Sequence, residues 1–165
     1  KKDTSFDEIS VTFYEDTYSL YNLYRFAHYY EEAYGKYIWL KSGASLVIEH
    51  TEAMTVIDVN TGSVLKKKRQ EDTLFYQINR EAAKEIARQI RLRNISGIIM
   101  IDFINMKDEK QKEKLLLLLE NECRKDRIHC NVVDMTALNL VEMTRSKVRR
   151  PLLEQITVCR KMQKN

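Results

Sequence analysis

The chain has 165 residues, of which 44% are apolar and 32% are charged, and its formal net charge is +4. That length suits one compact domain with its own core. We see no apolar run long enough to span a membrane, no secretory signal peptide, and three cysteines without a C-x-x-C pair, which argues against a disulfide framework or a zinc site. We therefore expect a cytoplasmic protein with no membrane segment.

Charge is distributed unevenly along the chain. Residues 1–60 hold five Lys/Arg against ten Asp/Glu, whereas residues 61–165 hold 23 against 14. A basic C-terminal part beside acidic side chains is typical of proteins that bind a polyanion such as nucleic acid. For any single lysine, a solvated helix face remains the more frequent explanation.

The first part of the chain predicts four elements. A short strand is expected over 8–14 and a tyrosine-rich helix over 17–34, which Gly35 ends. The aromatic stripe of this helix recurs at helical spacing, so we expect burial in a core ahead of base stacking. Strands over 36–41 and 45–50 flank a short turn and predict a hairpin.

The second part alternates strands with helices. Apolar residues recur every four positions between 70 and 93, which predicts the longest helix. The other expected elements are strands over 53–59 and 97–103, a helix over 108–125, and strands over 129–134 and 139–143. This order predicts an α/β fold with a mixed sheet and flanking helices.

Two of the predicted strands end on a carboxylate, Asp58 and Asp102. Because side chains at i and i+2 share one face of a strand, Asn60 joins Asp58 on the same face. If the helix over 70–93 connects these two strands, they run parallel and both carboxylates emerge at the same edge of the sheet. Ligands of open α/β sheets bind at that edge.

Paired carboxylates at such an edge suit a divalent cation. Mg²⁺ keeps much of its hydration and usually takes one or two carboxylates together with substrate phosphates. Asp58 and Asp102 are therefore candidate metal ligands, and Asn60 could hold a water or a phosphate oxygen. On spacing alone, an equally good explanation is that Asp58 caps the following turn and Asp102 caps the following helix.

Two basic segments are candidates for contact with the backbone of a nucleic acid. One precedes the long helix and the other follows the last predicted strand. A solvated loop explains the first at least as well, whereas the density of the second favours phosphate contact. The residues concerned are Lys66, Lys67, Lys68, Arg69, Arg145, Lys147, Arg149 and Arg150.

Six stretches of the sequence, taken in order, carry a family resemblance. They are residues 39–44, 46–53, 57–62, 79–94, 101–104 and 140–145. Together they closely resemble the catalytic region of the ribonuclease E/G family, and the likeness extends over about residues 36–158. Runs of this length in this order are far more specific than a single short motif.

This resemblance implies an endoribonuclease that uses Mg²⁺ as its cofactor, cuts single-stranded RNA in RNA processing and decay, and leaves 5′-phosphate ends. In that family the aspartates matching Asp58 and Asp102 hold the metal, and the asparagine matching Asn60 assists at the scissile phosphate. These three are therefore the candidate catalytic residues. The alternative is a catalytically inactive RNA-binding or assembly module that keeps the fold.

The resemblance also divides the chain into three parts. Residues 36–158 match the family's deoxyribonuclease I-like catalytic subdomain, residues 1–35 match the end of its ribonuclease H-like neighbour, and 159–165 form a basic tail. Family members join protomers through zinc at a C-P-x-C pattern, whereas this chain reads Cys159-Arg160-Lys161-Met162. A zinc-linked dimer is therefore not expected, and whether the chain forms another homo-oligomer stays open.

Overall fold

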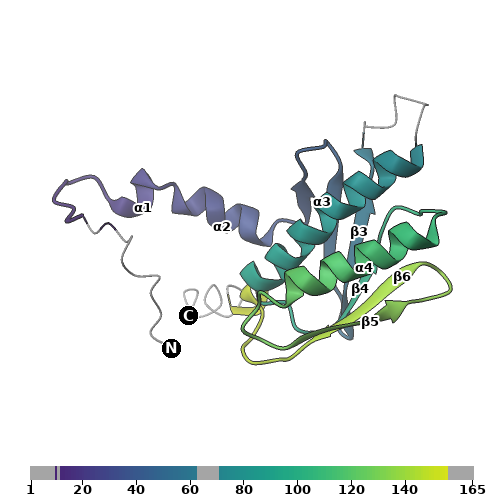
Figure 1. The fold of residues 1–165 in the computed structure, drawn as a ribbon. Coiled ribbons are helices and arrows are strands. Elements are labelled where there is room, and N and C mark those ends of the chain that lie inside the picture. The colour runs from purple at the N-terminus through teal and green to yellow at the C-terminus, as the bar shows by residue number, and fades with distance from the viewer. Residues whose placement is uncertain (1–9, 11, 63–70, 156–165) are drawn as a thin grey trace.

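Six strands form one mixed sheet in a computed structural model that describes residues 10, 12–62 and 71–155. The strand order is β1-β2-β3-β4-β6-β5 (Figure 1), and β3 and β4 are parallel while the other neighbours pair antiparallel. The strands are β1 (Tyr37–Trp39), β2 (Ser45–His50), β3 (Met54–Asn60), β4 (Gly97–Asp102), β5 (Cys130–Met135) and β6 (Leu140–Arg145). The predicted α/β fold with a mixed sheet and flanking helices is confirmed.

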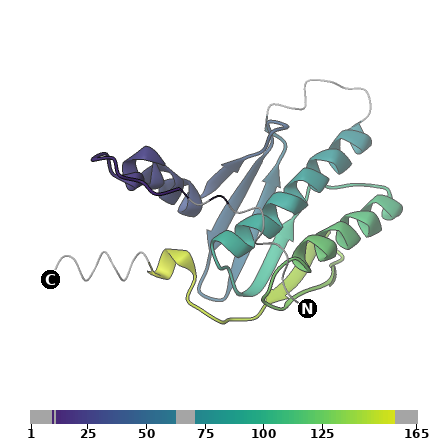
Figure 2. The same ribbon diagram turned by 60° about the vertical axis from the view of Figure 1, so that its left-hand side comes forward.

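Two long helices, α3 (Glu71–Leu92) and α4 (Glu109–Cys123), lie side by side across one face of this sheet (Figures 1 and 2). The four-residue spacing of apolar side chains explains why α3 packs on the sheet, because Ile78, Ala82 and Ile86 lie on one side of the helix and are at most 1% exposed. Hydrophobic burial of this stripe against the strands joins α3 and the sheet in one core.

The end of α3 directs the chain back into the sheet. Asn94 adopts a left-handed conformation with φ 50°, which is a frequent way to stop a helix, and the N–H of Ile95 donates to the carbonyl of Ile90 at 3.0 Å. The chain then enters β4 beside β3. The predicted crossover from β3 through a long helix to a parallel neighbouring strand is therefore confirmed.

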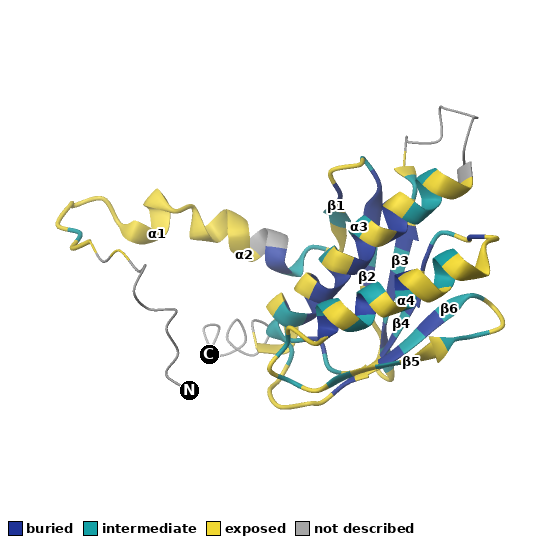
Figure 3. Ribbon diagram, viewed as in Figure 1, coloured by how far each residue is buried: buried dark blue, intermediate teal, exposed yellow. Residues whose placement is uncertain are grey.

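The N-terminal helical region differs from its prediction. Instead of one helix over 17–34 there are two, α1 (Leu20–Leu23) and α2 (Phe26–Tyr34), separated at Arg25 by a residue with φ 49°. The expected burial of the aromatic stripe is wrong, because its large side chains are 43–59% exposed on a segment that projects from the sheet and its long helices (Figure 3). They are Tyr18, Tyr21, Leu23, Tyr24, Phe26 and Tyr30. Helical periodicity identifies an apolar face but not what covers it.

The other predicted elements have clear outcomes. Every element predicted between residues 36 and 145 is present, with small shifts at its ends. The predicted strand over 8–14 lies partly outside the described residues, and residues 10 and 12–14 do not form a strand. Within the part of the chain that the structure describes, no helix is both long and apolar enough to cross a membrane.

The two faces of the sheet have different environments. Ile57 of β3 and Ile101 of β4 point toward the helices and are fully buried. Since side chains alternate along a strand, Asp58, Asn60 and Asp102 point to the opposite face, which neither α3 nor α4 covers. We call this opposite side the open face of the sheet.

Candidate active site

Asp58 and Asp102 lie directly beside each other on the open face. They are partners in the parallel register of β3 and β4, and each stands at or near the carboxyl end of its strand. Neighbouring strands are about 4.8 Å apart, so this register brings both carboxylates within reach of one ion. Asp58 is half-buried and Asp102 is exposed, so a ligand can approach from solvent.

Asn60 completes the predicted group of three. Its side chain leaves β3 on the same face as Asp58, and its amide Nδ2 donates a hydrogen bond of 2.7 Å to Oδ2 of Asp58. This bond orients the Asp58 carboxylate and the Asn60 amide relative to each other. The structure therefore brings together all three residues that the sequence marked as candidates.

The paired carboxylates create a locally unfavourable charge. Partial burial raises the pKa of Asp102 above its ordinary value of 3.8, and the adjacent negative charge of Asp58 raises it further. A cation placed between the two carboxylates would remove this repulsion. The electrostatics of the pair thus favour a bound positive charge.

The donor chemistry fits a hard divalent cation. Carboxylate and amide oxygens are the ligands that Mg²⁺ accepts, and it commonly completes its shell with waters. Among the residues that the structure describes, no group of three or more His, Cys, Asp or Glu side chains is placed to hold a metal ion. A cation held by Asp58 and Asp102 would have ligand positions left for water and substrate oxygens.

A buried asparagine that sequence reasoning missed supports the end of β4. Asn79 on α3 is fully buried, donates from Nδ2 to the carbonyl of Ile104 at 2.7 Å, and accepts from the N–H of Ile104 at 3.0 Å. These two hydrogen bonds fix the backbone of Ile104, two residues beyond Asp102. The signal in the sequence was a polar residue beside Ile78, at a core-facing turn of an otherwise regular apolar pattern.

A glutamate on the same helix fixes the turn that joins β1 to β2. The Glu81 carboxylate accepts the backbone N–H of Lys41 at 2.8 Å and that of Ser42 at 3.3 Å. The turn also packs against Gly62, two residues after the end of β3, because a Cβ added there would lie 2.5 Å from the carbonyl oxygen of Gly43. Only glycine allows that close approach, and Gly62 has φ +57°.

The predicted RNA-contacting residues have three different outcomes. Lys66, Lys67, Lys68 and Arg69 lie outside the described residues. Lys147, Arg149 and Arg150 are exposed and follow the end of β6 that pairs with the start of β4, so they lie at the opposite end of the strands from the carboxylate pair. Contact with RNA remains a prediction for residues 66–69 and for Lys147, Arg149 and Arg150.

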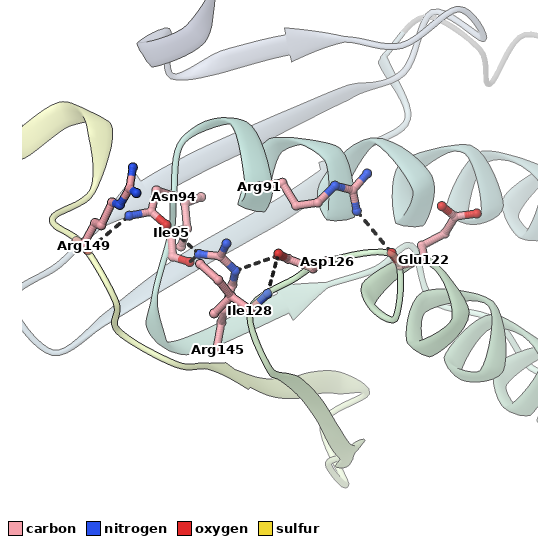
Figure 4. Close-up of polar contacts among 8 residues, drawn as sticks. All are labelled: Arg91, Asn94, Ile95, Glu122, Asp126, Ile128, Arg145 and Arg149. Atoms are coloured by element: carbon pink, nitrogen blue, oxygen red, sulfur yellow. Dashed lines mark hydrogen bonds and ion pairs between the residues drawn. The ribbon is translucent and has the colours of Figure 1, made fainter. Parts of the chain in front are cut away.

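Arg145 is a correction to the sequence prediction. Its side chain is 2% exposed, and its Nε pairs with Oδ2 of Asp126 at 2.9 Å. Its Nη1 donates to Oδ1 of Asn94 and to the carbonyl of Ile95, both at 2.9 Å (Figure 4). A guanidinium with these partners stabilises the fold and is not placed to contact a phosphate.

The ion pair of Arg145 also controls the charge of its partner. Burial alone would raise the pKa of Asp126, but hydrogen bonds from Arg145 and from the N–H of Ile128, together with the Arg145 charge, hold that pKa below its ordinary value. Asp126 is therefore ionised over the neutral range. The pair joins the loop before β5 to the end of β6 and to the connection between α3 and β4.

Comparison with known proteins places this geometry in a family. The model of the Ribonuclease E/G family matches residues 2–148. The chain is similar to Ribonuclease G of Escherichia coli K12, with 42% identity over 133 residues, which are 81% of this chain and 27% of that protein. Ribonuclease G of Haemophilus influenzae is 41% identical over 86% of this chain and 29% of its own length, and Ribonuclease E of Nostoc is 42% identical over 70% and 17%.

The chain thus spans about a quarter of the length of the Ribonuclease G relatives that it matches. The matched region contains the Asp58, Asn60 and Asp102 group and the helix that supports it. The family match covers most of the chain, and the chain belongs to the Ribonuclease E/G family.

Proposed function

We propose that this chain is the catalytic core of a Mg²⁺-dependent endoribonuclease that hydrolyses phosphodiester bonds in single-stranded RNA and leaves 5′-phosphate ends. The observation that carries the proposal is the direct pairing of Asp58 with Asp102 across two parallel strands. Membership of the Ribonuclease E/G family supports RNA as the substrate and RNA processing as the setting. A cytoplasmic location belongs to the same proposal.

The carboxylates and the asparagine of the site would have different roles. Asp58 and Asp102 would hold the cation, since the two residues are register partners on neighbouring strands and a positive charge would relieve their mutual repulsion. A bound Mg²⁺ would polarise a phosphodiester oxygen and lower the pKa of a water molecule. Asn60 adds a neutral polar group beside the pair, and its carbonyl oxygen can accept a hydrogen bond from that water.

The charge of the site explains why a cation is needed to bring RNA there. Two adjacent carboxylates repel a phosphate that approaches the open face. A bound Mg²⁺ would cancel the charge of the two carboxylates, so that a phosphate could approach. We therefore expect cleavage and metal binding to be lost together when one carboxylate is replaced.

The test is cleavage of a labelled single-stranded RNA oligonucleotide, with Mg²⁺ or with a chelator. The wild-type chain should cut only with Mg²⁺, and Asp102→Asn and Asp58→Asn should each lower the rate by roughly a hundredfold or more, since metal stabilisation amounts to several kcal/mol. Digestion of the products by an exonuclease that requires a 5′-phosphate reports the product ends. An Asp102→Asn variant that cuts as fast as the wild type would contradict the proposed site.

Glu52→Gln is the matched control. It removes one carboxylate charge in the exposed turn between β2 and β3, at the end of β3 that is remote from Asp58. We expect Glu52→Gln to cut at the wild-type rate. A wild-type chain that binds RNA and Mg²⁺ but does not cut would instead favour the inactive RNA-binding or assembly module.

A further inference from the structure

The edge strand β1 presents two large aromatic side chains to solvent. Tyr37 is 60% exposed and Trp39 is 73% exposed, and Trp39 is the single tryptophan of the chain. Between them, Ile38 points to the core opposite the fully buried Leu46. The alternation of the strand therefore turns both aromatic rings to the open face, where burial would be favourable but no core side chain lies over them.

The register of the sheet places these rings in line with the candidate active site. Trp39 pairs with Ser45 of β2, which pairs with Asn60 of β3. Side chains that oppose each other on neighbouring strands share a face, so Trp39 and Asn60 lie in one row across the sheet. Two strand spacings separate β1 from β3, which is about 10 Å.

A second row contains the other aromatic ring and both carboxylates. Tyr37 pairs with Val47, Val47 pairs with Asp58, and Asp58 pairs with Asp102. The intervening β2 residues, Ser45 in the first row and Val47 in this one, are smaller than the rings they separate. Tyr37 and Trp39 thus lie in the same rows as the candidate active site, and only the smaller side chains of β2 separate them from it.

The position of β1 relative to the site is fixed by the contacts of its turn. Glu81 of α3 accepts both N–H groups at the start of the turn, and that turn packs on the glycine two residues after Asn60. Tyr37 also has a cation over its ring, because Lys36 Nζ lies 5.7 Å from the ring centre. The rings are therefore held on the same rigid unit as the carboxylates.

We propose that Tyr37 and Trp39 form a stacking platform for unpaired bases of RNA next to the scissile phosphate; this inference rests on the proposed function. Every base has a π-face, so aromatic side chains beside a phosphate site bind single strands with little regard to sequence. A duplex hides those faces in its own stack. The platform would therefore contribute to the preference for single-stranded over paired RNA.

The position of Trp39 supplies a direct probe. In an Asp102→Asn background, which prevents cleavage, titration with a single-stranded RNA oligonucleotide should quench the fluorescence of Trp39 as binding saturates. An RNA duplex of the same sequence, or a strand of the same length with abasic positions, should quench much less. RNA that binds by anisotropy without changing Trp39 fluorescence would overturn the platform.

Substitutions then separate stacking from folding. Trp39→Ala and Tyr37→Ala should each weaken single-strand binding by roughly 5- to 150-fold, the range expected for loss of one base–aromatic stack, whereas Trp39→Phe should retain most of it. Leu117→Ala is the control, because Leu117 is a 57% exposed apolar side chain on α4, across the sheet from the platform. Melting curves of each variant report whether it folds.

Cleavage kinetics distinguish failure of the platform from failure of the proposed function. With cleavage intact, Trp39→Ala should raise KM and leave kcat nearly unchanged, because stacking beside the reacting bond contributes equally before and during the reaction. A Trp39→Ala variant with wild-type KM and binding overturns the platform and leaves the proposed function standing. RNA that quenches Trp39 but is never cut by the wild-type chain supports the platform and contradicts the proposed function.

Discussion

Replacing Asp102 by Asn should make the protein more stable while it abolishes the proposed activity. Asp102 lies beside Asp58 across one strand spacing, about 4.8 Å, and partial burial together with the adjacent charge of Asp58 raises the pKa of Asp102. Two charges about 5 Å apart repel by about 1 kcal/mol at the dielectric constant of water and by about 3 kcal/mol at an effective value near 20. Because Asp102 is exposed, we expect the lower figure, which corresponds to a rise in Tm of about 2–4 °C for a chain of this size.

The difference in stability between wild type and Asp102→Asn should increase as the pH rises. The pKa of Asp102 is raised in the folded state, so folded protein binds this proton more tightly than unfolded protein does. The corresponding stability is fully present below the ordinary value of 3.8 and is lost as pH rises through the raised value. Wild type and Asp102→Asn should therefore converge in acid and separate toward pH 7.

Thermal melts followed by circular dichroism, with a chelator present, measure this difference. Glu52→Gln should melt with the wild type, because it removes a charge without relieving the pair. Added Mg²⁺ should stabilise the wild type by mass action and narrow the gap to Asp102→Asn. Equal or lower Tm for Asp102→Asn at pH 7 without metal would refute the repulsion on which the site is argued.

Three further substitutions test the support of the site and of the fold. Asn79→Ala should destabilise by about 1–3 kcal/mol in urea unfolding and slow cleavage, since the backbone of Ile104 loses both bonds; unchanged stability would contradict this role. Arg145→Met should cost about 3–5 kcal/mol because Asp126 is left buried and charged, and a variant that unfolds like the wild type would refute the structural assignment. Gly62→Ala should lower both Tm and cleavage, since its φ is +57° and its Cβ meets backbone; wild-type values of both would contradict the close approach.

The carboxylate site could be predicted because it depends on local pattern and one topological rule. Asp58 and Asp102 end apolar runs, Asn60 follows at the spacing that keeps one face, and the long amphipathic segment between them makes the strands parallel. The structure shows the two aspartates as direct register partners. A register shifted by one residue would separate the two aspartates. The observed register depends on how the strands pack, which the local sequence pattern does not show.

Other features depend on partners distant in sequence. Arg145 stands in a basic stretch that looks like a phosphate-binding surface, yet Asp126 and Asn94, which satisfy it, lie 19 and 51 residues away. The aromatic stripe near the N-terminus has the spacing of a core helix, but its exposure depends on what packs against it. In the same way, the placement of Trp39 in one row with Asn60 follows from the pairing of both residues with Ser45 and not from neighbours in sequence.

The position of a bound cation would show whether Asp58 and Asp102 form a metal site. Crystals of the wild-type chain soaked in Mn²⁺, which shares the preference of Mg²⁺ for oxygen ligands, can be examined by anomalous diffraction. We predict a peak between the carboxylates of Asp58 and Asp102 that disappears in Asp102→Asn crystals. The N-cap of α4 is Asp108 and not Asp102, so capping of that helix does not explain Asp102. Absence of a peak in wild-type crystals would contradict the claim.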